Sequence, residues 1–230
     1  MKVALLQHTP EPERTVALAA RLCYSPADID ELQERLTGGD ITAFLDKIMS
    51  LGHHSVLEHA SFTFGIDGIS RAASHQLVRH RIASYSQQSQ RYVSHAQRFK
   101  AVVPDSIAAQ PELLAKFESQ LQALHDCYRT LVEAGVPAED ARYILPNATE
   151  TKIIVTMNAR GLRHFFALRC CERAQWEIRA MAVEMLALVR PVAPTFFRDA
   201  GPGCLNGPCP EGKFCCGKMK EVRERFKTLP

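Results

Sequence analysis

The sequence predicts an α+β fold, a mixed or antiparallel sheet flanked by helices, from two observations. Short β-branched or alternating apolar segments are scattered among longer segments with helical periodicity. The chain has 230 residues, 46% of them hydrophobic, which is enough to bury one core. We therefore expect a single domain over residues 1–200 and a Gly/Pro/Cys-rich tail over residues 201–230.

Strands are expected at three places. Residues 3–6 form a short apolar run. Residues 61–69 alternate, with Phe62 and Phe64 among the apolar positions, which is typical of a strand with one buried face. Residues 151–156 contain a β-branched run, so we expect a second central strand there.

Helices are expected where apolar residues recur at helical spacing. These segments are residues 10–23, 28–36, 41–51, 71–79, 112–134, 159–169 and 174–189.

Turn and cap residues set several of these limits. Gly38-Gly39 is read as a break between two short helices, and Gly135 as the end of a long one. Ser70 precedes the helix at 71–79, with Ala73, Leu77 and Val78 as inner positions, and Asn158 is placed as an N-cap.

A further pattern lies at Ser55 and Glu58. Their spacing fits a capping box, in which the serine hydroxyl and the glutamate carboxylate satisfy each other's backbone N–H groups.

Composition excludes several classes of protein. The net charge of +3 is too small for a protein that coats nucleic acid. No stretch reaches the roughly 18 to 20 apolar residues of a membrane span, and the N-terminus lacks the pattern of a signal peptide. We expect a cytoplasmic protein with mostly reduced thiols, bound to neither membrane nor nucleic acid.

Residues 76–91 form a first arginine-rich window. It contains Arg79, Arg81 and Arg91 but no carboxylate, so its charge requires an external anion or acids from elsewhere in the fold. Arginine forks match phosphate, and amides can read a pyrimidine edge. The alternative is a solvated basic loop. Residues 81–94 lack a period, which predicts an ordered loop with a short strand at 91–93.

Residues 158–173 form a second arginine-rich window. On an ideal helix Arg160, His164 and Leu168 share one face, and Arg169 lies about 180° from Arg160. Either the helix ends before Arg169, or the two arginines serve different parts of a site. A buried arginine also needs an anionic partner.

The pattern Arg79-His80-Arg81, seven residues, Ser89, one residue, Arg91 resembles the signature of the flavin-dependent thymidylate synthases. Further blocks follow in the family's order and together cover about residues 20–200. They lie at residues 52–59, 141–146, 158–160 and 174–179.

The resemblance implies the reductive methylation of dUMP to dTMP. The carbon would come from 5,10-methylenetetrahydrofolate, and the hydride from NADPH through FAD. The resemblance also implies a homotetramer with active sites shared between subunits.

The resemblance further assigns site residues. FAD would contact Ser55, Glu58, Arg79, His80, Arg81, Gln87, Asn158, Arg160, His164 and Arg169. The nucleotide would contact Gln76, Arg79, Gln87, Gln88, Ser89, Gln90, Arg91, Arg142 and Arg169. Relatives often have an acid at the position of Gln87 and a glycine at that of Gln90.

Two of these residues would act on the chemistry itself. Arg169 would stabilise an ionised uracil N3. No base for activating Ser89 is obvious from the spacing, so Ser89 is expected to position the substrate rather than attack it.

The tail leaves alternatives open. Cys204, Cys209, Cys215 and Cys216 could bind zinc, but their irregular spacing lacks CxxC pairs, so we expect no metal and a loosely packed tail with reduced thiols. Two rival classes remain for the chain, a zinc-stabilised structural protein and a single-strand-binding module that stacks bases on tyrosines.

Overall fold

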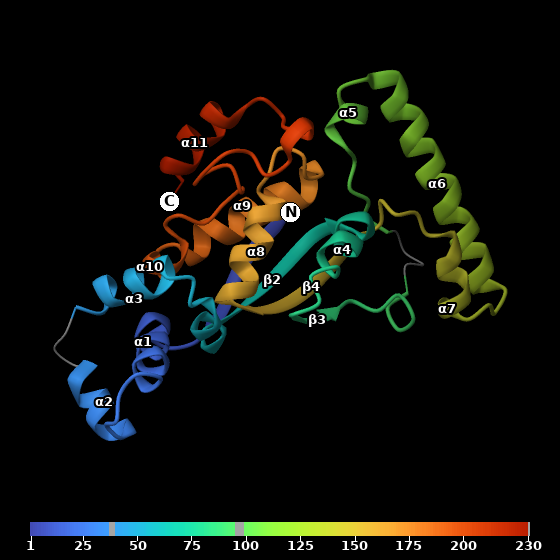
Figure 1. Cartoon of the computed structure of the whole chain (residues 1–230). Helices are drawn as coiled ribbons and strands as arrows, with labels where there is room; N and C mark the ends of the chain where they lie inside the picture. The colour runs from blue at the N-terminus through green and yellow to red at the C-terminus, as the bar shows by residue number, and fades with distance from the viewer. Residues whose placement is uncertain (37–39, 95–98, 230) are drawn as a thin grey trace. The chain divides into compact units, whose positions relative to one another are not determined.

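The computed structural model describes residues 1–36, 40–94 and 99–229, and it confirms the α+β fold (Figure 1). A four-stranded sheet has the order β1-β2-β4-β3. The strands are β1 (Lys2–His8), β2 (Ser61–Ser70), β3 (Ser84–Gln87) and β4 (Glu150–Asn158). No described helix is long and apolar enough to cross a membrane.

The two central strands, β2 and β4, are antiparallel. The Arg71 N–H donates to the Thr149 carbonyl at one end, and the Ala159 N–H donates to the Ala60 carbonyl at the other. Partners therefore run in opposite order along the two strands. The expected alternation along β2 is also present, because Phe62 and Phe64 are fully buried.

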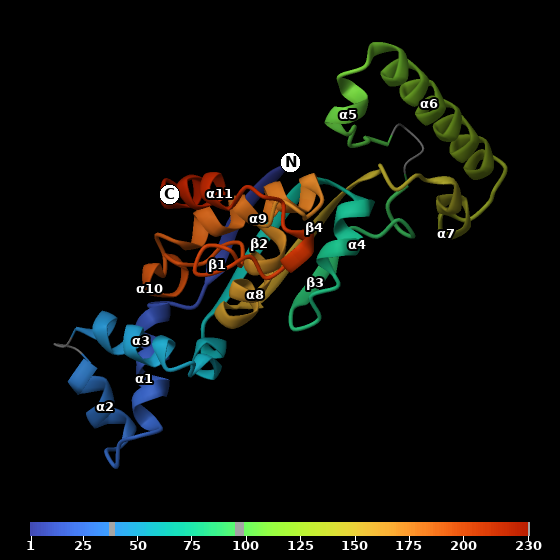
Figure 2. The ribbon, with the colours of Figure 1, turned by 45° about the horizontal axis from the view of Figure 1, so that its top comes forward.

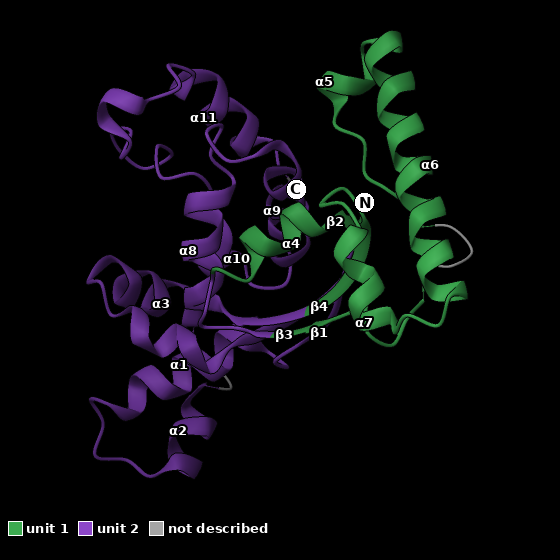
Figure 3. Ribbon diagram, turned by 90° about the vertical axis from the view of Figure 1, so that its right-hand side faces the viewer, with its two compact units in different colours: residues 1–2, 66–79, 85–154 green, residues 3–65, 80–84, 155–230 purple. Residues whose placement is uncertain are grey.

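The chain divides into two compact units, each assembled from separated segments (Figure 3). Unit 1 contains residues 1–2, 66–79 and 85–154. Unit 2 contains residues 3–65, 80–84 and 155–230.

Unit 2 has an aromatic core beside α8 (Ala159–Arg169) and α9 (Trp176–Val189). The Phe197 ring meets Phe62 edge-on at 5.4 Å and Phe166 at 6.0 Å between centroids. Edge-to-face pairs of this kind add to the free energy gained from burial. The apolar positions expected along α9 are mostly buried, which holds α8 in place.

The N-terminal helices of unit 2 pack together, as Figure 2 shows. They are α1 (Pro12–Leu22), α2 (Ile29–Leu36) and α3 (Ile41–Ser50), followed by the 3₁₀ turn η1 (His54–His59). The predicted Gly38-Gly39 break lies outside the described residues.

Unit 1 contains mainly helices and turns. They are α4 (Arg71–Leu77), α5 (Asp105–Ala108), α6 (Pro111–Glu133), α7 (Ala138–Ala141) and η2 (Arg142–Ile144). Ser70 caps α4 by accepting from the Ala73 N–H, as expected. The long helix α6 ends before Gly135, which has a left-handed φ of 86°.

The C-terminal segment is packed into unit 2 rather than loose. It contains α10 (Pro194–Phe197), η3 (Gly212–Phe214) and α11 (Met219–Lys227). Arg190 is 8% exposed and donates to backbone carbonyls. These acceptors are Phe197, Ala200, Phe226 and Leu229.

Three local predictions were wrong. Residues 91–93 form a turn, and the strand lies earlier, at β3, beyond which the Gln88 N–H donates to the Lys152 carbonyl at 3.0 Å. Ser55 lies inside η1, whose N-cap is His53, so the capping box is not formed. Val78 is 38% exposed because α4 ends at Leu77.

Candidate active site

The residues assigned to the site divide between the two units. Unit 2 contains Ser55, Glu58, His80, Arg81, Asn158, Arg160, His164 and Arg169. Unit 1 contains Gln76, Arg79, Gln87, Gln88, Ser89, Gln90, Arg91 and Arg142.

Arg169 and His80 are the centre of the unit 2 set. Arg169 is the last residue of α8, and its Nε donates to His80 Nε2 at 3.0 Å. The imidazole also meets Phe165 edge-on at 4.9 Å between centroids, and His164 at 6.1 Å. The signature loop, residues 79–91, is therefore joined through His80 to the C-terminal end of α8. The helix dipole favours a cation at that end.

The His80 imidazole is neutral near pH 7. Burial, then the charges of Arg169 and His164, lower its pKa from 6.5 to about 4. An acceptor at Nε2 places the proton on Nδ1. Burial also lowers the pKa of Arg169, which remains a cation because the ordinary value of arginine is so high. The bond between the two thus orients the guanidinium without cancelling its charge.

The N-terminal end of α8 is built as expected. The Asn158 side chain accepts from the Gly161 N–H at 2.8 Å, which confirms the cap. A Cβ on Gly161 would lie 3.3 Å from Asn158 Oδ1 and 3.5 Å from the Ile82 carbonyl oxygen. A Cβ here would therefore crowd the capping oxygen of Asn158 but make only ordinary van der Waals contact with Ile82.

Arg160 has a different partner from Arg169. Its Nη1 lies 2.6 Å from Glu58 Oε1, and both side chains are about half exposed. Because α8 runs through Arg169, the helix does not end before this residue, and the two arginines contact different partners. Ser55 and Arg81 are exposed in the same unit.

In unit 1, the Gln87 side chain is held by hydrogen bonds to buried residues. Its amide donates to Ser74 Oγ at 2.9 Å and to Thr151 Oγ1 at 3.2 Å, and both acceptor residues are buried. The Tyr85 hydroxyl donates to the Leu77 carbonyl, and burial raises the pKa of Tyr85 to about 12. The signature loop is therefore tied to α4 and β4 before it reaches Ser89.

Arg91 receives its counter-charge from α7. Its Nε and Nη2 both lie 2.8 Å from Glu139 Oε2, and both side chains are about half exposed. Arg142 Nε donates to the Glu139 carbonyl at 3.0 Å. Ser89 Oγ accepts the Arg91 N–H at 3.1 Å.

Glu139 is thus the residue that sequence reasoning missed. The first window was expected to need an acid from elsewhere, and the sequence offered a weak signal, because Glu139 lies just before the block at residues 141–146 that contains Arg142.

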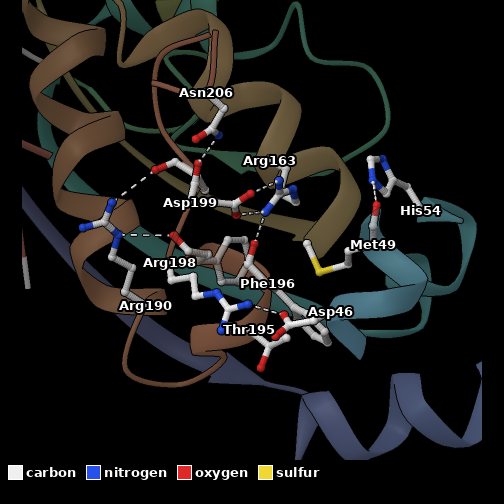
Figure 4. Close-up of polar contacts among 12 residues, drawn as sticks. Asp46, Met49, His54, Arg163, Arg190, Thr195, Phe196, Arg198, Asp199 and Asn206 are labelled. Atoms are coloured by element: carbon white, nitrogen blue, oxygen red, sulfur yellow. Dashed lines mark hydrogen bonds and ion pairs between the residues drawn. The ribbon is translucent and has the colours of Figure 1, made fainter. Parts of the chain in front are cut away.

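Two described cavities lie apart from the assigned residues. One of about 550 Å³ in unit 1 is lined by Phe99, His125 and Glu150, among others. Another of about 360 Å³ in unit 2 lies beside Arg163 and Asp199, which form a two-pronged ion pair (Figure 4). None of the site residues predicted from sequence lines either cavity.

Comparison with known proteins gives consistent results. Residues 4–195 match the family described as thymidylate synthase complementing protein. A flavin-dependent thymidylate synthase of Geobacter sulfurreducens is 72% identical over 230 residues, covering 100% of this chain and 99% of that protein. One of Pyrococcus horikoshii is 45% identical over 238 residues, covering 100% and 98%.

Solved structures with the same fold include the flavin-dependent thymidylate synthase of Helicobacter pylori, complexed with FAD and dUMP. Its TM-score is 0.69 at 26% identity, covering 87% of this chain and 100% of that one. A UMP/dUMP methylase of Streptomyces cacaoi has a TM-score of 0.75 at 23% identity, covering 85% and 92%, and supports the fold alone.

Proposed function

This chain belongs to the flavin-dependent thymidylate synthase family, and on that premise we propose that it converts dUMP to dTMP by reductive methylation with FAD. The observation that carries the proposal is the 72% identity to a thymidylate synthase of this kind over the whole chain. The solved complex with FAD and dUMP, which covers 87% of this chain, supports the same cofactor and substrate.

The proposal extends to the co-substrates and the assembly. The carbon comes from 5,10-methylenetetrahydrofolate, NADPH reduces the flavin, and four copies form a homotetramer in the cytoplasm with shared active sites. The family resemblance supports these points. We also place the enzyme domain at residues 1–200 and a tail at 201–230; the family match over residues 4–195 supports this boundary.

The unit 2 set fits FAD. The N-terminal end of α8 attracts anions, and Arg81 and Arg160 add exposed cations suited to a pyrophosphate. We assign the flavin contacts in this unit to Ser55, Glu58, His80, Arg81, Asn158, Arg160, His164 and Arg169. When bound, the flavin supplies the hydride, and the chain supplies binding and orientation.

Arg169 is assigned to the uracil ring as well. A guanidinium held by a neutral imidazole keeps its full charge, so it can stabilise a negative charge that develops on N3. His80 acts through Arg169 here, by fixing the direction of the guanidinium.

The unit 1 set is assigned to FAD through Arg79 and Gln87, and to dUMP through Gln76, Arg79, Arg142 and residues 87–91. Arg91 is half exposed and directs Nε and Nη2 at one carboxylate oxygen of Glu139, so the two nitrogens that could bind a phosphate are held near the surface. A bound phosphate therefore competes with Glu139 for Arg91. Ser89 accepts an N–H from Arg91 and positions the substrate without attacking it.

A visible absorption spectrum of the purified protein, followed by titration with dUMP, tests the proposal. We expect a flavin spectrum that shifts with dUMP and does not shift with dCMP at equal concentration. A protein that stays colourless after incubation with FAD contradicts the proposal and directs attention to binding of single-stranded nucleic acid, which salt-dependent binding would reveal.

A further inference from the structure

The cavity of about 550 Å³ in unit 1 lies between α6 and residues 99–103. Its volume is within the roughly 300–1,000 Å³ of small-molecule sites. The 99–103 side is fixed by backbone bonds, because the Glu150 N–H donates to the Lys100 carbonyl and the Val102 N–H donates to the Ala148 carbonyl, both at 2.8 Å. One wall is therefore hydrogen-bonded to the start of β4, and the other is a helix.

The helical wall is held in place by its inward face. Leu121, His125 and Tyr128 lie four and three residues apart, so they share one side of α6. His125 and Tyr128 are the buried residues of this helix, and Tyr128 has no exposed surface. The His125 imidazole also meets the Phe99 ring edge-on at 5.7 Å between centroids. Packing thus fixes His125 at the wall of the cavity.

His125 has a buried nitrogen without a partner. The residue is only 6% exposed, and within residues 1–36, 40–94 and 99–229 its Nδ1 has no hydrogen-bond partner. Buried polar atoms nearly always have one, because an unpaired atom loses its hydration without compensation. Since His125 lines the cavity, a bound molecule can reach this nitrogen. The site therefore asks for a ligand with a hydrogen-bonding group at that point.

The rest of the lining combines apolar and acidic side chains. Phe99, Val103 and Leu121 provide apolar surface. Glu118, Glu150 and Lys100 supply the charged groups, two carboxylates against one ammonium. Such a lining favours a ligand that has an apolar body and a positive charge.

We propose that this cavity binds a small phenolic amine. Its hydroxyl pairs with His125 Nδ1, and because a hydroxyl both donates and accepts, it matches either tautomer of the imidazole. The aromatic ring packs against Phe99 and Leu121, and the ammonium group faces the carboxylates of Glu118 and Glu150. The inference is independent of the proposed function, because it uses none of the residues assigned to FAD or dUMP.

Calorimetric titration of the FAD-loaded protein with three related compounds tests the site. Tyramine has both groups, phenethylamine lacks the hydroxyl, and p-cresol lacks the ammonium. We expect one tyramine per chain with a Kd of about 0.1–1 mM. Phenethylamine should bind about 5–10-fold more weakly, because it leaves Nδ1 unpaired. The loss for p-cresol should be about two- to fivefold, since the carboxylates lie near solvent.

Variants assign the two contacts. His125→Leu keeps an apolar side chain in the wall but removes Nδ1, so tyramine and phenethylamine should bind it equally. Glu118→Gln changes an exposed residue and should weaken tyramine binding about two- to fivefold. Glu112→Gln is the matched control, an exposed acid of the same helix outside the cavity, and should bind tyramine as the parent does. Unchanged flavin absorbance and unfolding temperature show that a variant is folded.

Three results would overturn the proposal. The first is the absence of saturable tyramine binding up to about 10 mM. The second is equal affinity of the parent for tyramine and phenethylamine, which is the result expected if a water molecule satisfies Nδ1. The third is displacement of tyramine by dUMP, because tyramine would then occupy the nucleotide site.

Discussion

Arg169 in unit 2 and Arg91 in unit 1 are held in opposite ways. Arg169 donates to a neutral imidazole and is partly withdrawn from solvent. Arg91 is forked onto the carboxylate of Glu139, and both side chains are about half exposed. A neutral partner orients a cation and leaves its charge for a ligand, whereas an acidic partner neutralises it until a stronger anion arrives. The first arrangement suits charge that develops during a reaction, and the second suits reversible binding.

The largest effect is expected from Arg169→Ala. Removing a preoriented donor from developing charge costs about 10²–10³ in kcat. Flavin absorbance should be retained, because other residues are assigned to FAD as well. Arg169→Lys is the matched control, since it keeps the charge but loses the Nε–H group that donates to His80. Steady-state dTMP formation measures kcat for both variants. A parental kcat in Arg169→Ala would contradict the proposed difference in role between Arg169 and Arg91.

Arg91→Ala should act mainly on binding. A hydrogen bond to a charged group contributes about 1.5–3 kcal/mol, so the Kd for dUMP should rise by about 10–100-fold. The kcat at saturating dUMP should change much less. Flavin-monitored dUMP titration and saturation kinetics separate the two quantities. A fall in kcat as large as that of Arg169→Ala would show that the two arginines do not differ in role.

The neutral state of His80 predicts a pH dependence of stability. Its folded pKa of about 4 lies below the ordinary 6.5, so between these values the unfolded chain binds the extra proton and the folded chain does not. Stability contributed by this site is complete above about pH 6.5 and falls as the pH drops towards 4.

The variant His80→Gln keeps a neutral acceptor and should flatten this dependence. Urea unfolding of parent and variant at pH 7 and pH 5 measures the difference between them. An equal loss of stability in both proteins would mean that burial and the neighbouring charges do not hold His80 neutral in the folded protein.

The smallest effect is expected from Glu139→Gln. This change removes the competitor of the phosphate, while an exposed ion pair contributes only about 0–1 kcal/mol. The Kd for dUMP should therefore fall by no more than about fivefold. Glu133→Gln is a matched control, an exposed acid in the same unit without contact to Arg91. Weaker dUMP binding in Glu139→Gln would indicate that Glu139 supports Arg91 rather than competing with the ligand.

Features set by neighbouring residues were predictable. The alternation of β2, the Asn158 cap and both ends of α8 follow from local patterns, and the structure has all of them. The position of β3 was not predictable, because its pairing partner near Lys152 is distant in sequence. The capping box failed for a similar reason, since Glu58 pairs with Arg160 instead.

The candidate site was only partly predictable. The signature motif identified the residue types, but not their partners. His80 and Arg169 are 89 positions apart, and Glu139 lies 48 positions from Arg91. Partnerships over such distances depend on how the strands and helices fold back, which no periodicity within one segment records.

Arg190 ties the C-terminal segment to the buried interior of unit 2. One guanidinium satisfies carbonyl groups from three stretches that meet beneath it, around Phe197 and Ala200, at Phe226 and at Leu229. Deleting the final helix would strand a desolvated cation next to the aromatic core instead of merely trimming a surface appendage. Truncation there should consequently resemble a core substitution, because the C-terminal segment is part of the same compact unit as α8.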